Sequence, residues 1–337
     1  MAKTKNVLET LPNYGFTSSL NTSGACRKAM GSFQYLKLLE GYEGRIFDED
    51  VAIEMYVEII SSRISVPIHD VFKTYRKNKS MFYTNEEIYA RLVEMYGSDV
   101  DKAVFERVGS YFIGHNNLGL SIVKNGKTMR LTKTGRMIVD SLRADEEQTK
   151  AICKGVLLNA MCKYPQNAFD AKKLKRKVAN NKVVFPFMLS VLQKVGYISK
   201  VDIPILSAWP TSNADACAKV ILERRDKGYT VSGNIMFMIN LIDMNSDSVF
   251  KFEDTKREES EKNIIEAFTR NWFDFYETTN LVKVIGKGDS IKIILNEEEE
   301  ELIKYVIQQY SNSALNYNSY TEQFNALQVL DSYFFEK

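Results

Sequence analysis

Residues 120–132 read Leu-Ser-Ile-Val-Lys-Asn-Gly-Lys-Thr-Met-Arg-Leu-Thr and lead into the helical pattern Lys-Thr-Gly-Arg-Met-Ile-Val-Asp-Ser-Leu of residues 133–142. Two apolar runs around an Asn-Gly turn indicate a β-hairpin, and Thr132 is a helix-capping residue type. A related pattern follows at residues 281–295, Leu-Val-Lys-Val-Ile-Gly-Lys-Gly-Asp-Ser-Ile-Lys-Ile-Ile-Leu, before Asn296 and five glutamates. We interpret the glutamates as a helix start, where negative charge is favoured. The sequence therefore predicts two hairpin-and-helix modules.

A hairpin with a basic, glycine-containing tip beside a helix is typical of the wing of a winged-helix unit, a module that commonly binds nucleic acid. Between the two hairpins, residues 185–225 follow the order helix, glycine turn, helix, turn, helix, which is the spacing of a helix-turn-helix core. The fold class expected is therefore mainly α (α+β), with tandem winged-helix or helix-turn-helix DNA-binding units and short β-hairpin wings.

Apolar periodicity and capping residues predict the helices of both units. They are expected at 24–41, 49–63, 85–96, 100–112, 152–161 and 185–195, then after a Ser199 cap as far as Pro204, at 214–225 after an Asn213 cap, and at 230–241 and 263–276. Aromatic residues at helical spacing are expected in the core rather than in base stacking: Phe112, Phe187, Phe268, Trp272 and Tyr276.

The polar stretch 143–149 suggests a boundary between two domains. We expect recognition units at 1–145 and 146–310, and a C-terminal linker or helix at 311–337.

Composition limits the classes of function. With 45 Lys and Arg against 43 Asp and Glu, the formal charge is +2, so affinity for polyanions has to come from local clusters. The four cysteines are scattered and there are two histidines, so no metal site is expected. No signal sequence and no apolar run of membrane-spanning length is present, which predicts a cytoplasmic protein without a membrane partner.

Several basic or polar groups are candidates for DNA contacts. The densest is Lys172, Lys173, Lys175, Arg176, Lys177 and Lys182; a second, on the expected recognition helix, is Lys219, Arg224, Arg225 and Lys227. The others are Thr17, Ser18, Ser19, Arg27 and Lys28 near the N-terminus, and Lys124, Lys127 and Lys287 at the hairpin tips. The alternative readings are solvated helix faces for the basic groups and a capped loop for the N-terminal segment.

Four stretches, taken in order, resemble the DNA-recognition half of type IIS restriction and nicking endonucleases of the AlwI kind. They are residues 16–45, 129–139, 187–203 and 267–281 with the hairpin that follows. The resemblance extends from about residue 14 to about residue 320, and it rests on dispersed apolar and turn positions. It implies that recognition domains come first and that a separate PD-(D/E)xK nuclease domain follows, which cuts outside the recognised site with Mg²⁺.

The chain ends at Lys337, about where the resemblance implies a linker to the nuclease domain. Such a nuclease needs carboxylates and a lysine that converge on Mg²⁺. Two acid-x-Lys triplets occur, Asp170-Ala-Lys172 and Asp254-Thr-Lys256, and the second follows Asp243 and Asp247. Triplets of this kind are common by chance. We therefore expect this chain to have no catalytic residues, no metal and no cofactor of its own, with Mg²⁺ belonging to a nuclease domain or subunit.

The main hypothesis is sequence-specific binding of double-stranded DNA by a monomer that forms the recognition region of a type IIS restriction or nicking endonuclease. A tandem winged-helix transcriptional regulator or replication initiator is one alternative. A self-contained Mg²⁺-dependent nuclease that uses Asp254 and Lys256 is another, and a protein-interaction scaffold is a third, because fold analogy does not establish function.

Overall fold

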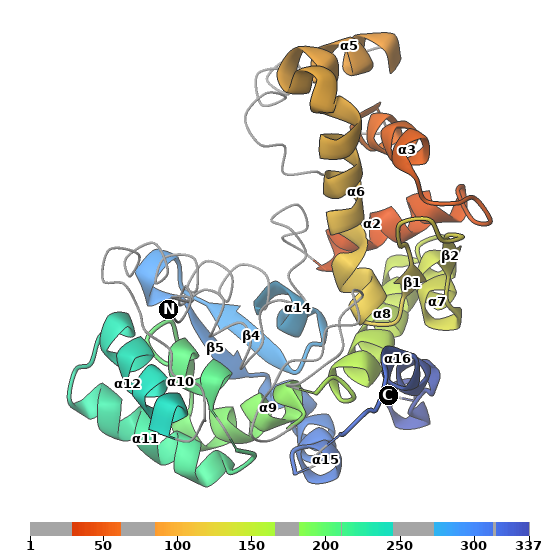
Figure 1. Cartoon of the computed structure of the whole chain (residues 1–337). Helices are drawn as coiled ribbons and strands as arrows, with labels where there is room; N and C mark the ends of the chain where they lie inside the picture. Colours follow the sequence, from red (N-terminus) through yellow and green to blue (C-terminus); the bar gives the residue numbers. More distant parts are fainter. Residues whose placement is uncertain are drawn as a thin grey trace. The chain divides into compact units, whose positions relative to one another are not determined.

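The computed structural model describes residues 29–61, 85–165, 182–209, 211–244, 273–312 and 315–336 (Figure 1). These residues form helices with small antiparallel sheets, which confirms the mainly helical α+β class. The chain divides into two compact units, which we call the N-terminal unit (described from residue 29 to Cys153) and the C-terminal unit (from Lys154 to residue 336). The division lies inside the helix that begins at Glu146, so the stretch 143–149 holds the start of that helix.

The N-terminal unit is built on a packed pair of helices, α3 and α6, whose inner faces bury apolar side chains. Its elements in order are α2 (Ala29–Glu40), α3 (Glu49–Ser61), α5 (Asn85–Tyr96), η1 (Gly97–Asp99), α6 (Val100–Asn117), β1 (Ser121–Ile122), β2 (Arg130–Leu131), α7 (Lys133–Ser141) and the first half of α8 (Glu146–Met161). Phe112, Met55 and Val104 are fully buried, and Phe47 stacks on Phe105 with ring centroids 4.8 Å apart. This aromatic and aliphatic burial provides most of the stabilisation of the unit.

The residues that follow α2 add a third extended segment beside the β1–β2 hairpin. Gly44 N donates to Met129 O (3.0 Å), Phe47 N donates to Lys127 O (3.0 Å), and Ile46 forms an antiparallel bridge with Thr128. β2 and the residues before it therefore lie between β1 and residues 44–47.

The C-terminal unit also has helices before a hairpin and a helix after it, and its hairpin is longer. After α8 come α9 (Val184–Val195), β3 (Ile198–Ser199), α10 (Ile203–Ala208), α11 (Ala214–Asp226), α12 (Val231–Met244), α14 (Phe273–Thr278), β4 (Val282–Ile285), η4 (Gly288–Ser290), β5 (Lys292–Leu295), η5 (Glu297–Glu299), α15 (Glu300–Tyr310), α16 (Tyr320–Gln328) and η6 (Ser332–Phe334). The strand order is β3-β5-β4, with Ile293 paired to both Ile198 and Val284. Each unit thus has a helix, a short extended segment (residues 44–47 or β3), several further helices, a hairpin whose second strand is central, and a following helix.

Most predicted helices are confirmed where the structure describes them. α5 has the predicted limits, and Asn213 caps α11 by accepting a hydrogen bond from Ala216 N (3.0 Å). Asn296 caps the glutamate run by accepting from Glu298 N (3.4 Å), and Phe112, Phe187 and Tyr276 are buried as predicted. Phe268, Trp272 and most of the helix predicted at 263–276 lie outside the described residues.

The helix predicted at 152–161 begins six residues earlier, at Glu146, and two further local predictions are wrong. α6 continues past Phe112 to Asn117, because the buried Asn116 bonds to the following strand: its side chain donates to Val123 O (2.8 Å) and accepts from Val123 N (3.0 Å). Ser199 is the last residue of β3 and not a helix cap. α10 begins at Ile203 with Pro204 in its first turn, where the missing N–H has no helical partner to lose.

The predicted C-terminal linker or helix contains α16 and η6, which dock on the rest of the C-terminal unit. Asn159 of α8 donates to Leu327 O (3.0 Å) and accepts from Asp331 N (3.1 Å). Tyr305 and Tyr310 of α15 both donate to the Asp331 carboxylate, and Tyr305 stacks on Tyr333. These contacts hold residues 315–336 against α8 and α15.

Candidate nucleic-acid interface

The first hairpin ends in a tight turn with an exposed basic tip. Lys127 N donates to Lys124 O (3.0 Å), and Gly126 has a φ of +66°, a conformation that glycine adopts without strain. Gly126 N also donates to Phe47 O (2.9 Å), which holds the turn against the adjacent segment 44–47. Lys127 is exposed, whereas Lys124 is half-buried. The predicted basic hairpin tip is therefore present in the N-terminal unit, with Lys127 as its solvent-facing cation.

The start of α7 is fixed against the base of this hairpin. Thr132 caps α7 by accepting from Gly135 N (3.0 Å), and its hydroxyl also lies 2.7 Å from Gly119 O. A Cβ placed on Gly135 would lie 1.9 Å from Leu120 O, so this close approach requires glycine. The Thr132 to Gly135 stretch therefore determines where the side chains of β2 and of the first turn of α7 point.

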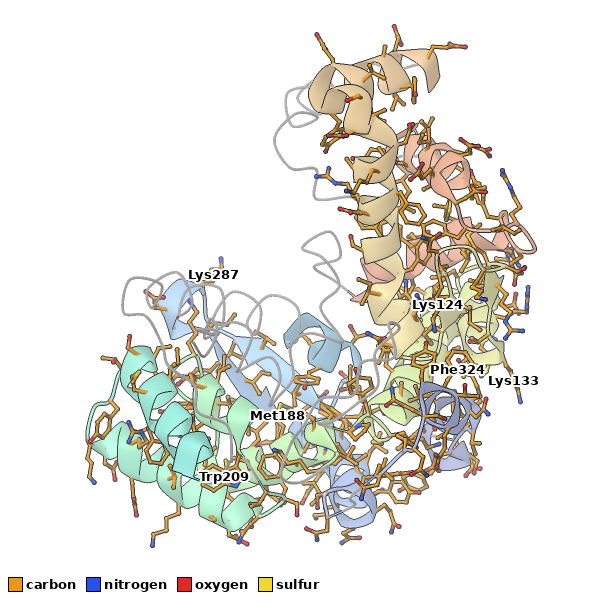
Figure 2. All side chains as sticks on the ribbon, in the orientation of Figure 1. Lys124, Lys133, Met188, Trp209, Lys287 and Phe324 are labelled. Carbon is orange, nitrogen blue, oxygen red and sulfur yellow. The ribbon has the colours of Figure 1, made fainter. Side chains whose placement is uncertain are left out.

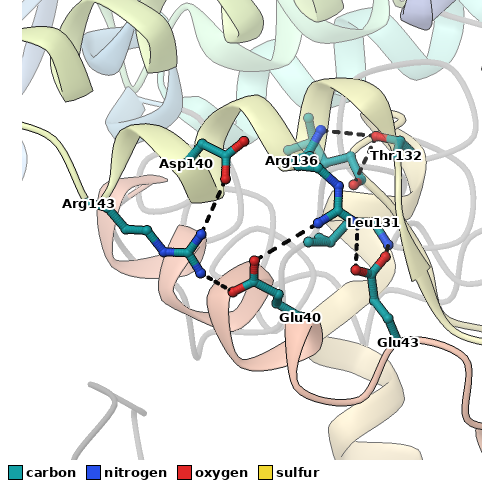
Figure 3. Close-up of polar contacts among 9 residues, drawn as sticks. Glu40, Glu43, Leu131, Thr132, Arg136, Asp140 and Arg143 are labelled. Atoms are coloured by element: carbon teal, nitrogen blue, oxygen red, sulfur yellow. Dashed lines mark hydrogen bonds and ion pairs between the residues drawn. The ribbon is translucent and has the colours of Figure 1, made fainter.

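An ion-pair network joins α7 to the end of α2 (Figure 3). Arg136 pairs with Glu43, whose other oxygen accepts from Leu131 N (2.7 Å). Arg143 pairs with Glu40 and, at 3.3 Å, with Asp140. Because these side chains are partly exposed, each pair adds at most about 1 kcal/mol. Their effect is to hold α7 in register with α2.

The second hairpin is longer, and its tip is also rigid. Gly286 has a φ of +83°, and a Cβ on it would lie 2.4 Å from Ser290 O. The Ser290 hydroxyl accepts from Lys287 N (3.2 Å). Lys287 is exposed and extends from the end of the hairpin (Figure 2), while Lys200 of the β3–α10 turn pairs with Asp289 (3.1 Å). The second predicted basic tip thus has one exposed lysine and a neutralised aspartate.

The helix start after the second hairpin is acidic. Glu299 accepts from Lys154 (2.6 Å), Glu298 pairs with Lys283 (3.4 Å), and Glu300 pairs with Lys304 (2.5 Å). Asn280, in the turn between α14 and β4, has a φ of +62° and donates to Glu299 (2.7 Å). These glutamates therefore stabilise the α14–hairpin–α15 junction and neutralise the lysines around it.

On the predicted recognition helix α11, the two arginines make contacts within the unit. Arg225 forms a two-point ion pair with Asp202 and also donates to Val195 O (3.2 Å). The Arg224 guanidinium lies 3.7 Å from the ring centroid of Tyr229 and donates to Gly233 O (2.8 Å). Lys219 remains exposed, with a loose 3.9 Å pair to Glu223, and Lys227 is exposed.

The assignment of Lys182 to the densest basic cluster is wrong. Lys182 is fully buried, donates to Trp209 O, and lies 4.8 Å from the ring centroid of Phe187. Burial lowers the pKa of its amine to about 7, because desolvation disfavours the charged form. A buried amine cannot neutralise a phosphate, so this side chain anchors the N-terminal end of α9 instead.

Many of the predicted contacts lie outside the described residues. These are Thr17, Ser18, Ser19, Arg27, Lys28, Lys172, Lys173, Lys175, Arg176 and Lys177. Asp170, Asp254 and Lys256 of the two acid-x-Lys triplets also lie outside the described residues. The two ends of the segment 166–181 are described. Pro165 and Val183 form an antiparallel bridge, and Val184 N donates to Tyr164 O (3.4 Å), so the described residues on either side of this segment lie next to each other.

Three cations of the first module were not among the predicted contacts. Arg130, Lys133 and Arg136 continue the spacing of Lys124 and Lys127, so that a cation occurs at every third residue. Arg130, Lys133 and Arg136 are all exposed, and Figure 2 shows Lys133 extending from the start of α7. This periodic spacing, across a turn, a strand and a helix start, was the sequence signal that could have identified them.

No protein-family model matches the chain, and no curated protein matches it. A solved structure described as modified DNA in complex with the BpuJ1 endonuclease binding domain is similar, with a TM-score of 0.42 and 16% identity. It covers 72% of this chain and 83% of that chain.

The described part of the chain contains no group of three or more His, Cys, Asp or Glu that could hold a metal ion. None of its helices has the length and apolarity needed to cross a bilayer. Cys153, Cys162 and Cys217 are free and buried, and burial raises the pKa of the Cys153 thiol to about 11.

Proposed function

We propose that this chain binds double-stranded DNA sequence-specifically as the recognition region of a type IIS restriction or nicking endonuclease. The observation that carries the proposal is the repeated module. In both units a helix and a short extended segment come first, several further helices follow, and then a hairpin, whose second strand is central, leads into another helix. This is the order of a winged-helix unit, and both hairpins end in an exposed lysine, Lys127 and Lys287. We therefore interpret the units as tandem winged helices.

In the proposed mode of binding, basic side chains fix the register of the protein on the phosphates, and one helix of each unit enters a major groove to contact base edges. The hairpins reach the adjacent backbone. Rigid hairpin tips support this role, because Gly126, Gly286 and Ser290 set the tip conformation before DNA binds. A pre-formed contact surface loses less conformational entropy on binding.

Hydrolysis is assigned to a PD-(D/E)xK nuclease domain or subunit that holds Mg²⁺, as the AlwI-like resemblance implies. Incubation of the purified chain with supercoiled plasmid and Mg²⁺ tests this part. The expected result is intact plasmid. Nicking that the Asp254→Ala variant abolishes would instead support a self-contained nuclease.

Selection from a pool of randomised duplexes, followed by sequencing of the retained DNA, tests the binding function. The expected result is enrichment of one short asymmetric sequence by a monomer. Enrichment of a palindrome by a stable dimer would favour a transcriptional regulator or replication initiator, because two-fold protein symmetry matches palindromic sites. No enrichment would remove sequence specificity from the proposal.

A further inference from the structure

Charge in the N-terminal unit is separated between its two ends. Residues 108–139 contain five Lys or Arg residues and no Asp or Glu. By contrast, residues 49–61 and 85–107, which form α3, α5 and the first part of α6, contain ten Asp or Glu and three Lys or Arg. Asp140, near the end of α7, pairs with Arg143. A polyanion is therefore attracted to the hairpin and the start of α7 and repelled from α3 and α5.

The register of the hairpin shows where these cations point. Arg130 lies opposite Ile122 on the outer face of the sheet, while Leu131 and Ser121 are paired and buried on the inner face. Lys127 occupies the exposed tip, and Lys133 is the first residue of α7. Lys127, Arg130 and Lys133 thus lead from the tip along the strand to the helix start.

These three cations are also available for a ligand. Arg136 pairs with Glu43, but among the described residues no ion pair joins Lys127, Arg130 or Lys133 to a carboxylate. Their backbone is held by the Thr132 and Gly135 contacts at the start of α7 and by the Phe47 bonds at the turn. Unpaired cations on a fixed backbone attract phosphates without a large ordering cost.

The corresponding surface of the C-terminal unit has the opposite character. Five glutamates in succession follow its hairpin, three in η5 and two at the start of α15, whereas α7 begins with Lys133. Lys283 and Lys304 are paired with Glu298 and Glu300, so Lys287 is the main exposed cation near this hairpin in the described residues. The glutamates would repel phosphates that approach the start of α15.

We propose that Lys127, Arg130 and Lys133 form the main phosphate-contact surface of the described chain, which we call the first-hairpin cationic surface. The start of α15 faces away from the DNA backbone. The two modules are therefore not equivalent: the first grips the backbone with its hairpin and its post-hairpin helix, and the second approaches with the Lys287 tip alone. This inference rests on the proposed DNA-binding function.

The test is the salt dependence of binding to the selected duplex. Each phosphate contact adds about 0.9 to the slope of log affinity against log salt. The triple variant Lys127→Gln, Arg130→Gln, Lys133→Gln is expected to lower this slope by about 2.7, if all three side chains make a contact. A matched control, Lys150→Gln, Lys283→Gln, Lys304→Gln, removes the same charge from residues already paired with Glu146, Glu298 and Glu300, and its slope is expected to stay unchanged.

Urea unfolding of both triple variants checks that each remains folded. The inference would be overturned if the salt slope of the first triple variant were unchanged, or if the control lost as much slope. Specific binding by the unmodified chain would in either case still support the proposed function. Absence of any duplex binding by the unmodified chain would overturn both.

Discussion

Arg225 and Asp202 form a two-point ion pair, with Arg225 Nε 2.9 Å from Oδ1 and one terminal nitrogen 2.7 Å from Oδ2. The Asp202 side chain is 1% exposed, and its Oδ2 also accepts from Ser199 N (2.7 Å). The pair therefore joins α11 to the β3–α10 turn. An arginine predicted from the sequence to contact DNA instead holds the helices of its own unit together.

The Arg225→Met variant is expected to lose about 3–5 kcal/mol of unfolding free energy, because the buried carboxylate of Asp202 is left without its partner. Urea unfolding measures the loss. As a control, Lys219→Met on the same helix should change stability by less than about 0.5 kcal/mol, since its side chain is 77% exposed. A stable Arg225→Met protein with impaired DNA binding would contradict this account and favour a direct DNA contact.

Buried Lys182 should make stability depend on pH in the alkaline range. Its pKa is lowered from 10.5 to about 7, so the folded protein holds it neutral above neutral pH while the unfolded chain still binds the proton up to its ordinary pKa. Unfolding takes up a proton in that window, and stability rises with pH by up to about 1.4 kcal/mol per unit. Urea unfolding of the wild type and of Lys182→Met measures this rise, which should be smaller in the variant. Equal slopes would show that Lys182 is not the source.

His115 should contribute to acid sensitivity of the N-terminal unit. It is fully buried near the rings of Phe33 and Phe112, and burial lowers its pKa from 6.5 to about 3. Between these values the unfolded chain binds a proton that the folded chain does not, so stability falls as pH falls through this window. In the His115→Leu variant, the slope of unfolding free energy against pH over this acid range should be smaller by the contribution of one titrating group. Thermal or urea unfolding across that range decides, and an unaltered slope counts against the assignment.

Two glycines in neighbouring elements should respond in opposite ways to alanine. Gly135→Ala should be destabilising, because the added Cβ would meet Leu120 O at 1.9 Å and displace α7 from the hairpin. Gly109→Ala in α6 places its Cβ 3.7 Å from Phe47, an ordinary contact, and should stabilise the helix by about 0.5–1 kcal/mol. Thermal unfolding compares them; similar destabilisation of both would argue against the close packing at Gly135.

Local signals in the sequence were sufficient to predict many of the helices and turns, though not all of their limits. The Asn-Gly turn, the Asn213 and Asn296 caps and the α5 periodicity all appear in the structure, because turn and capping chemistry depends on neighbours along the chain. The end of α6 was not predictable in this way. Asn116 is a poor helix former that the hydrogen bonds to Val123 retain in the helix.

The candidate site was harder to predict, because the availability of a cation depends on its tertiary neighbours. Arg225 and Lys182 look like DNA-binding residues in the sequence, yet one is paired with Asp202 and the other is buried beside Phe187. Arg130 and Lys133 are exposed and were overlooked, since they lie in a strand and a helix start rather than in a dense basic run.

The most direct test of the central claim is a comparison of affinities at one fixed salt concentration. The duplex selected from the random pool and a scrambled duplex of the same composition are titrated with the chain, and binding is followed by fluorescence anisotropy. The account predicts that the selected duplex binds at least about a thousandfold more tightly, as specific DNA-binding proteins do. Equal affinity for the two duplexes would contradict it.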